Sequence, residues 1–426
     1  MLKPNYKDKE EHAKYLAQYD IDPRKAMLTI ILSILVDVFG YSMVLPLLPT
    51  IAKNFGASDF IVGILISSNA LSALIFGPIW GRLSDRFGRK PILIISQAGT
   101  GISFLILAFS PDLSFIFFSR VLDGIFGGQI PVIRAYIADI TTPKTRSAKM
   151  TTIMVGNTAG MIFGPIIGGF LGTLNWRYPA FLASGLSVLT IILTKKLLIE
   201  SLPKERISDL RLHFDEIEKS AGNLKRTIWK KEVILRLIQI FLTFMITVMI
   251  NSSFPLILDK RFGANPFIIG TVMTAAGIVL MLYAGLAMKF LLKKIGEKRL
   301  LILGILLLIV NFIIFPMLNE LWMVYIFVIP FALSMATIPP LLQSNLTKAV
   351  DPDKQGIVSG WSTNFQSISQ TMAPLVSTYY LDINGVILFS LYLNSYQLIG
   401  FTAVFLGIIL SLIVAFDFKK NPHLYD

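Results

Sequence analysis

About twelve apolar runs, each close to 20 residues long, are the feature that most limits what this chain can fold into. An α-helix of about 20 residues crosses the hydrocarbon core of a bilayer, and it pairs its own backbone N–H and C=O groups there. Only 15% of the 426 residues are charged, whereas soluble domains carry about 25%. The runs lie near residues 27–49, 60–80, 92–110, 114–137, 150–173, 177–195, 233–256, 266–290, 300–317, 320–343, 356–378 and 397–417. The sequence therefore predicts an all-α integral membrane protein with about 12 transmembrane helices.

The positive charge is concentrated in alternate loops. Nearly all of the 39 Lys and Arg residues fall in the N-terminal tail and in every second loop between the apolar runs. The loops of the opposite side hold few: Lys53, Arg177, Lys260 and Arg261. Because loops rich in Lys and Arg stay in the cytoplasm, we expect both termini there. The net charge of +13 then reflects topology, and a nucleic-acid-binding surface is excluded.

The chain divides into two related halves around one long polar stretch, part of which (207–219) is predicted to form a short surface helix. Three landmarks recur about 209 residues later, which indicates an internal repeat: Gly88, Pro143 and Pro165 match Gly296, Pro352 and Pro374. We therefore expect two pseudo-symmetric six-helix bundles. The expected parts are a cytoplasmic tail 1–26, an N-terminal bundle 27–195, a cytoplasmic linker 196–232, a C-terminal bundle 233–418 and a cytoplasmic tail 419–426.

The composition gives little support to catalysis or metal binding. The chain has no cysteine, which excludes disulfides, thiolate catalysis and cysteine metal sites. Its three histidines, His12, His213 and His423, fall in expected cytoplasmic segments and cannot form a metal site inside the bundles. No nucleophile–base cluster and no Walker A sequence occurs. We therefore expect a protein that is not an enzyme, needs no cofactor and is not driven by ATP within this chain.

The basic stretch from Gly81 to Pro91 lies between two apolar runs, and by itself it reads as a turn that fixes topology. Its residue order resembles the signature loop of the major facilitator superfamily, Gly-x-x-x-Asp-Arg/Lys-x-Gly-Arg/Lys-Arg/Lys. The resemblance implies a latch at the cytoplasmic side, and any latch belongs to the first half because the loop near Lys289–Arg299 lacks the Asp. The matching residues are Gly81, Asp85, Arg86, Gly88, Arg89 and Lys90, with Asp139 expected to pair with one of these bases.

A second resemblance lies in the fifth apolar run, where small residues recur every four positions. Such a face lets two helices pack backbone to backbone, and a membrane helix tolerates a proline kink within it. By itself the pattern indicates a tight helix pair. In full it resembles the antiporter motif of the drug:proton antiporter branch of the superfamily, which implies an interface that discourages leak through the empty carrier. Its residues are Gly156, Gly160, Gly164, Pro165, Gly168 and Gly169.

Charges inside the apolar runs are the candidates for proton coupling. Asp37 lies near the middle of the first run, where a carboxylate costs about 2.5–3.5 kcal/mol on an insertion scale and is functional by default. It also resembles the first-helix acid of many drug:proton antiporters; the alternative is a permanent ion pair with Arg120. Arg120 and Asp123 share a helix face and are expected to pair with each other, with a proton role for Asp123 left open. They resemble the family's Arg-x-x-Gln-Gly segment, with Asp in place of Gln.

The second half offers side chains that are polar but uncharged, together with aromatic and Met residues. Such a lining suits an amphiphilic substrate, although ordinary interhelical hydrogen bonding explains it equally well. The expected cavity residues, including one from the first helix, are Tyr41, Asn251, Gln343, Trp361, Asn364 and Phe365.

We interpret the chain as a secondary active transporter that works by alternating access. The resemblance implies proton-coupled export of amphiphilic organic compounds of the multidrug type. The expected partners are a small amphiphilic molecule, protons and the lipid bilayer, for a monomer in the plasma or inner cell membrane. Alternatives are a flippase for lipids or lipid-linked sugars, a proton-coupled importer of sugars or organic acids, and, from another class, a membrane sensor.

Overall fold

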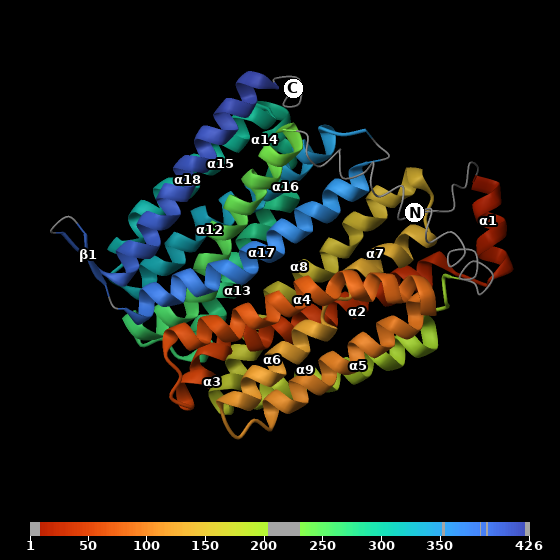
Figure 1. The fold of residues 1–426 in the computed structure, drawn as a ribbon, viewed down its shortest axis with the longest axis horizontal. Coiled ribbons are helices and arrows are strands. Elements are labelled where there is room, and N and C mark those ends of the chain that lie inside the picture. The colour runs from red at the N-terminus through yellow and green to blue at the C-terminus, as the bar shows by residue number, and fades with distance from the viewer. Residues whose placement is uncertain (1–8, 203–230, 352–353, 384, 389–390, 422–426) are drawn as a thin grey trace. The chain divides into compact units, whose positions relative to one another are not determined.

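The computed structural model describes residues 9–202, 231–351, 354–383, 385–388 and 391–421, which Figure 1 draws as a coloured ribbon. The predicted surface helix at 207–219 lies outside the described residues, as do His213 and His423. In the first half the elements are α1 (Lys9–Gln18), α2 (Pro23–Val44), the 3₁₀ turn η1 (Leu45–Leu47), α3 (Leu48–Asn54), α4 (Asp59–Phe87), α5 (Arg89–Ala108), α6 (Leu113–Phe126), α7 (Ile130–Asp139), α8 (Pro143–Leu174) and α9 (Tyr178–Leu197).

The second half is also helical, apart from one short antiparallel hairpin whose strands pair Val386 with Leu393. Its elements are α12 (Lys231–Phe262), α13 (Pro266–Leu282), the π-helical turn η2 (Tyr283–Ala287), α14 (Met288–Ile295), α15 (Glu297–Ile314), the 3₁₀ turn η3 (Phe315–Met317), α16 (Leu321–Lys348), α17 (Gln355–Asp382), β1 (Val386–Leu388), β2 (Leu391–Leu393) and α18 (Ser395–Lys420).

The helices confirm the predicted membrane fold. Within the described residues, 11 helical stretches of 19 to 32 residues are long and apolar enough to cross a membrane. The run near 356–378 corresponds to α17, which is 28 residues long but carries Gln, Ser and Thr along much of its length. The chain is therefore an all-helical membrane protein of 11 to 12 spans.

Several helices differ in extent from the apolar runs that predicted them. We call Gly81–Pro91 the signature segment; the sequence predicted a loop here, but only Gly88 lies outside α4 and α5. An apolar run ends where the lipid ends, whereas charged residues such as Arg82 and Arg86 support a helix in water equally well. The run 114–137 is instead divided into α6 and α7 at Gly127–Gln129.

The one-residue turn of the signature segment has a counterpart in the second half. Gly88 has φ of +97° and precedes α5, and Gly296 has φ of +81° and precedes α15. Positive φ is readily adopted by glycine and strains other residues, which explains why the repeat retains glycine at both places.

Polar side chains begin several of the helices. Asp22 accepts hydrogen bonds from the N–H groups of Arg24 and Lys25 at the start of α2, and these bonds lower the pKa of its carboxyl below the ordinary value. Asn394 and Gln397 form a reciprocal capping box at the start of α18. Both arrangements satisfy backbone N–H groups that the first helical turn leaves unpaired.

By the density of its internal packing the chain forms two compact units. The first comprises Met1–Leu45 with Leu71–Asn223, and the second comprises Pro46–Ala70 with Leu224–Asp426. Residues 46–70, which the sequence assigns to the N-terminal bundle, thus group with the C-terminal half. The division of the chain into two six-helix bundles and a linker therefore remains a prediction.

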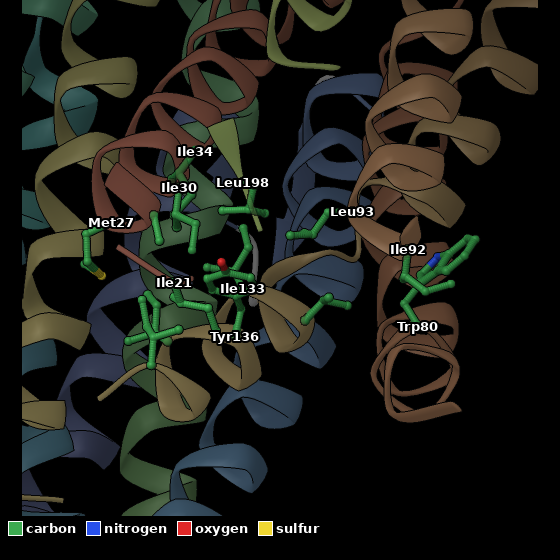
Figure 2. Close-up of a cluster of buried hydrophobic side chains, with 14 residues drawn as sticks. Ile21, Met27, Ile30, Ile34, Trp80, Ile92, Leu93, Ile133, Tyr136 and Leu198 are labelled. Atoms are coloured by element: carbon green, nitrogen blue, oxygen red, sulfur yellow. The ribbon is translucent and has the colours of Figure 1, made fainter. Parts of the chain in front are cut away.

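The core of the first unit joins α2, α4, α5 and α7. Figure 2 shows its cluster of buried side chains, among them Ile30 and Ile34 of α2, Tyr136 of α7 and Leu198, which follows α9. Apolar side chains on one face of each helix bury against the others and are removed from water and lipid alike. Leu198, from beyond the last apolar run of this half, is therefore part of the same core.

The core of the second unit contains a group of phenylalanines. Phe327 of α16 stacks on Phe254 of α12 with ring centroids 6.2 Å apart, and lies 6.4 Å from Phe312 of α15 in an edge-on arrangement. Aromatic pairs at these separations add to the stability gained from burial. In the same unit α18 packs against α12 and α15 (Figure 1).

Candidate functional site

The carboxylate of Asp37 is held by a neutral amide. Asp37 lies in the second half of α2, and Nε2 of Gln129 donates a hydrogen bond to its Oδ2. The other carboxylate oxygen of Asp37 is buried and has no hydrogen-bond partner among the described residues. The sequence left open an ion pair between Asp37 and Arg120, but among the described residues Arg120 forms its ion pair with Asp123. Asp37 is therefore a half-buried acid, with one fully buried oxygen, and its hydrogen-bond donor Gln129 carries no charge.

Gln129 reaches Asp37 because the chain leaves the helix between α6 and α7. Gly128 lies against α4 so closely that a Cβ atom on it would be 3.0 Å from Cα of Gly77. Gln129 follows at once and is 4% exposed. Gln129 was not among the residues predicted from the sequence, although the Gly127–Gly128 pair inside an apolar run indicates that the helix breaks there.

Arg120 and Asp123 are brought together, one turn apart on α6. Nη1 of Arg120 lies 3.4 Å from Oδ2 of Asp123, and both side chains are buried. Ser103 of α5 donates a hydrogen bond of 3.4 Å to the same carboxylate, and the guanidinium lies 5.5 Å from the ring centroid of Phe104. The positive charge of Arg120 is thus balanced by the negative charge of Asp123.

Tyr41, an expected cavity residue, lies on α2 one turn beyond Asp37 and is half-buried.

The signature segment surrounds one arginine. Arg89 is buried; its Nη1 lies 2.6 Å from Asp85 and its Nε 3.2 Å from Asp139 at the end of α7. Ser84 accepts a further hydrogen bond of 2.6 Å from Nη1. Arg86 is exposed, and Gly81 lies within α4. The segment is thus a compact ionic cluster tied to α7.

The glycine face of α8 packs against α2, the helix that carries Asp37. A Cβ atom on Gly156 would lie 2.8 Å from the carbonyl oxygen of Ile31, and one on Gly160 would lie 2.9 Å from that of Leu35. Ser42 donates a hydrogen bond of 2.8 Å to the carbonyl oxygen of Gly160. The two backbones are therefore in direct contact. The same helix carries the rest of the motif: Gly164 and Gly168, which would meet Ser42 and Met43, and Pro165 and Gly169.

In the second unit a chain of uncharged hydrogen bonds joins α16 to α17. Ser362 donates to Oε1 of Gln343 at 2.6 Å, and Gln366 donates to Ser362 at 3.0 Å. Phe365 lies on the same helix with its ring edge-on to Phe241, and Asn364 is half-buried. Two other expected cavity residues, Asn251 and Trp361, are exposed. Gln343 is thus the one expected cavity residue with a place in this hydrogen-bond chain.

Two ion pairs of the second unit were not foreseen. Arg236 of α12 and Asp417 of α18 lie 3.2 Å apart, both with no exposed surface. Lys348 at the end of α16 lies 2.7 Å from Glu297 at the start of α15. In the internal repeat, Glu297 corresponds to Arg89 and Lys348 corresponds to Asp139. The acid and the base have therefore exchanged places between the two halves. The repeated loop therefore keeps an ion pair although it has lost the Asp of the signature.

A further charged cluster in this unit joins the α3–α4 turn to the end of α12. Asp59, which is 4% exposed, lies 3.8 Å from Lys53 and also pairs with Lys260. Lys53 in turn lies 2.9 Å from Asp259. From the sequence, Lys53 and Lys260 were identified only as positive charges in loops, and their ion pairs were not predicted. Among the described residues no group of three or more His, Asp or Glu side chains is placed to hold a metal ion.

Comparison of the sequence with known proteins identifies a family and several relatives. The family model of the Major Facilitator Superfamily matches residues 30–374 and 237–422. Multidrug resistance protein 2 of Bacillus subtilis (strain 168) is 31% identical over 370 residues, which cover 85% of this chain and 91% of that protein. Tetracycline resistance protein, class B, of Escherichia coli is 29% identical over 345 residues, which cover 80% and 85%.

Solved structures show the same fold. The structure of a bacterial homologue of the human lysosomal transporter Spinster aligns with a TM-score of 0.73 at 13% sequence identity, covering 94% of this chain and 97% of that one. The peptide transporter POT in complex with sulfate aligns with a TM-score of 0.71 at 15% identity, covering 94% and 95%.

Proposed function

The chain belongs to the Major Facilitator Superfamily, and on that premise we propose that this secondary transporter exports amphiphilic organic compounds in exchange for protons. It is a transporter and not an enzyme. The names of two relatives, multidrug resistance protein 2 and tetracycline resistance protein, class B, support export of drug-like molecules. The orientation follows the charge of the loops, with both termini in the cytoplasm and the protein in the cell membrane.

The observation that carries the proposal is the neutral partner of Asp37. A buried acid in an ion pair cannot take up a proton without leaving its partner's charge unmatched in a low-dielectric medium. Asp37 is hydrogen-bonded to the amide of Gln129 instead, and its second oxygen has no partner among the described residues. It can therefore gain and lose a proton without stranding a counter-charge. Arg120 already has a partner in Asp123.

The remaining candidate residues have supporting roles in this proposal. The Arg120–Asp123 pair supplies fixed charges beside the proton site. The glycine face of α8 holds α2, and with it Asp37, in one position against its neighbour. The cluster of Asp85, Arg89 and Asp139 forms the first-half side of a cytoplasmic latch, and the uncharged α16–α17 hydrogen bonds with nearby aromatic rings offer a surface for an amphiphilic substrate.

The proposal is tested by transport driven by a pH gradient in proteoliposomes. With purified protein, the movement of ethidium and of tetracycline is followed while the proton gradient is recorded with a pH-sensitive dye. We expect each substrate that is moved to dissipate the gradient, and Asp37→Asn to abolish gradient-driven movement. The matched control is Asp382→Asn, which neutralises an exposed acid at the end of α17.

Two results would count against the proposal. If Asp37→Asn moves these compounds under the imposed pH gradient as fast as the parent does, Asp37 is not the proton-coupling residue. If the compounds move while the pH gradient stays unchanged, transport is not coupled to proton exchange.

A further inference from the structure

Five residues after α9 are bound to the first unit although the sequence assigns them to a linker. We call Leu198–Leu202 the strap. Leu198, Ser201 and Leu202 are almost completely buried. Leu198 belongs to the hydrophobic cluster that contains Ile30 of α2 and Tyr136 of α7 (Figure 2). The strap is therefore packed as part of the first unit.

The carboxylate of Glu200 in the strap caps α5. Its Oε1 accepts a hydrogen bond of 2.8 Å from the N–H of Arg89, and its Oε2 accepts one of 3.0 Å from the N–H of Lys90. Oε1 also accepts a bond of 3.0 Å from the N–H of Leu202, which fixes the carboxylate within the strap. A negative charge at the first N–H groups of a helix stabilises that helix end.

This cap comes from a distant residue because the local one cannot supply it. The residue before α5 is Gly88, which has no side chain. A Cβ atom on Gly88 would lie 3.0 Å from Cδ of Glu200, so any larger residue would displace the carboxylate. Gly88 thus permits both the sharp turn and the approach of Glu200.

Further hydrogen bonds tie the strap to the helices around it. Ser201 donates to Oδ2 of Asp139 at 3.1 Å, and Tyr136 donates to the carbonyl oxygen of Ile199 at 2.7 Å. Tyr15 of α1 donates to the carbonyl oxygen of Ser201 at 2.6 Å. The strap therefore contacts the start of α5, the end of α7 and the N-terminal helix.

Arg89 lies at the centre of these contacts. Its side chain joins Asp85 and Asp139, while its backbone N–H is bound by Glu200. Three acids from three parts of the chain thus fix one arginine.

We propose that Glu200 is a positioning residue of the signature segment: it holds the first turn of α5, and with it Arg89, in register with Asp85 and Asp139 during the transport cycle. This role rests on the proposed transport function. Glu200 is not expected to contact substrate or protons. Its loss loosens the first turn of α5, which slows the conformational step and leaves substrate affinity unchanged.

The direct test is hydrogen–deuterium exchange in a peptide covering residues 87–95 of the purified protein. The variants are Glu200→Gln, which keeps the shape and one acceptor, and Glu200→Ala, which removes the cap. We expect exchange at Arg89 and Lys90 to accelerate by about fivefold in Glu200→Ala, the usual effect of losing one cap, and by less in Glu200→Gln. The control is Glu232→Gln, an exposed acid in the first turn of α12.

Transport kinetics of ethidium supply the second readout. We expect Vmax to fall about five- to tenfold in Glu200→Ala with KM changed less than about twofold, and Glu200→Asp to restore part of the rate. Unchanged exchange at residues 87–95 would overturn the proposal, as would faster exchange throughout the first unit, because the strap would then be a general stabilising element. Exchange is measured without any substrate, so its result stands whatever the protein transports.

Discussion

Removing one member of the buried pair Arg236–Asp417 is predicted to destabilise the protein far more than removing both. Neither side chain has any exposed surface. A single replacement, Arg236→Met or Asp417→Leu, leaves an uncompensated charge in a low-dielectric medium, which costs about 3–5 kcal/mol. The double replacement puts apolar side chains of similar size in place of both charges, and its free energy of unfolding is expected within about 1 kcal/mol of the parent.

The structure places the expected loss at the lower end of that range. After Asp417→Leu, Nη1 of Arg236 keeps a hydrogen bond of 2.7 Å to the carbonyl oxygen of Glu232. After Arg236→Met, Asp417 keeps a bond of 2.8 Å from Nδ2 of Asn421. Each remaining charge is thus partly satisfied, and we expect each single variant to lose about 3 kcal/mol.

The assay is equilibrium unfolding of purified protein in mixed micelles with increasing SDS, followed by the fluorescence of the five tryptophans. The control cycle uses Asp351 and Lys354, a pair 2.6 Å apart whose side chains are 64% and 31% exposed. Its single variants are expected to lose less than about 1 kcal/mol. A double variant at Arg236 and Asp417 that loses the sum of the two single losses would refute the reasoning.

Two further predictions concern packing and charge outside that pair. Gly160→Ala should lower the free energy of unfolding by about 1–3 kcal/mol because its Cβ atom meets the α2 backbone. The control is Gly185→Ala in α9, where a Cβ atom meets nothing within 4 Å. Equal losses in the two variants would contradict the close α2–α8 contact. Asp59→Asn should cost about 1–2 kcal/mol, since it leaves Lys53 and Lys260 without their shared acid. The same unfolding assay checks both, and an Asp59→Asn variant as stable as the parent would show that the cluster contributes nothing.

Much of the fold follows from local features of the sequence. Runs of apolar residues predicted the helices because the bilayer leaves few other ways to pair a backbone. The four-residue spacing from Gly156 to Gly168 predicted a backbone contact, and the structure identifies its partner as α2. The spacing of Arg120 and Asp123 predicted that they meet, because residues three apart share a helix face.

What the sequence did not reveal depends on residues distant in the chain. Gln129 reaches Asp37 across 92 residues, and Glu200 reaches Arg89 across 111. No periodic pattern encodes such contacts, since they arise only when helices pack. The turn predicted at Gly81–Pro91 is present but is limited to Gly88, and the rest of the segment is helical. Hydropathy marks the edge of the lipid, whereas Gly88 sets the helix ends here.

The central claim, that Asp37 exchanges protons in response to substrate, is tested most directly by counting protons released on binding. Ethidium is added to purified protein in a weakly buffered detergent solution near pH 7, and the released protons are titrated while binding is followed by ethidium fluorescence. We expect the parent to release about one proton per bound ethidium and Asp37→Asn to bind ethidium without release, because proton release is linked to binding only through a group that titrates. Equal proton release by Asp37→Asn and the parent at equal binding would contradict the account.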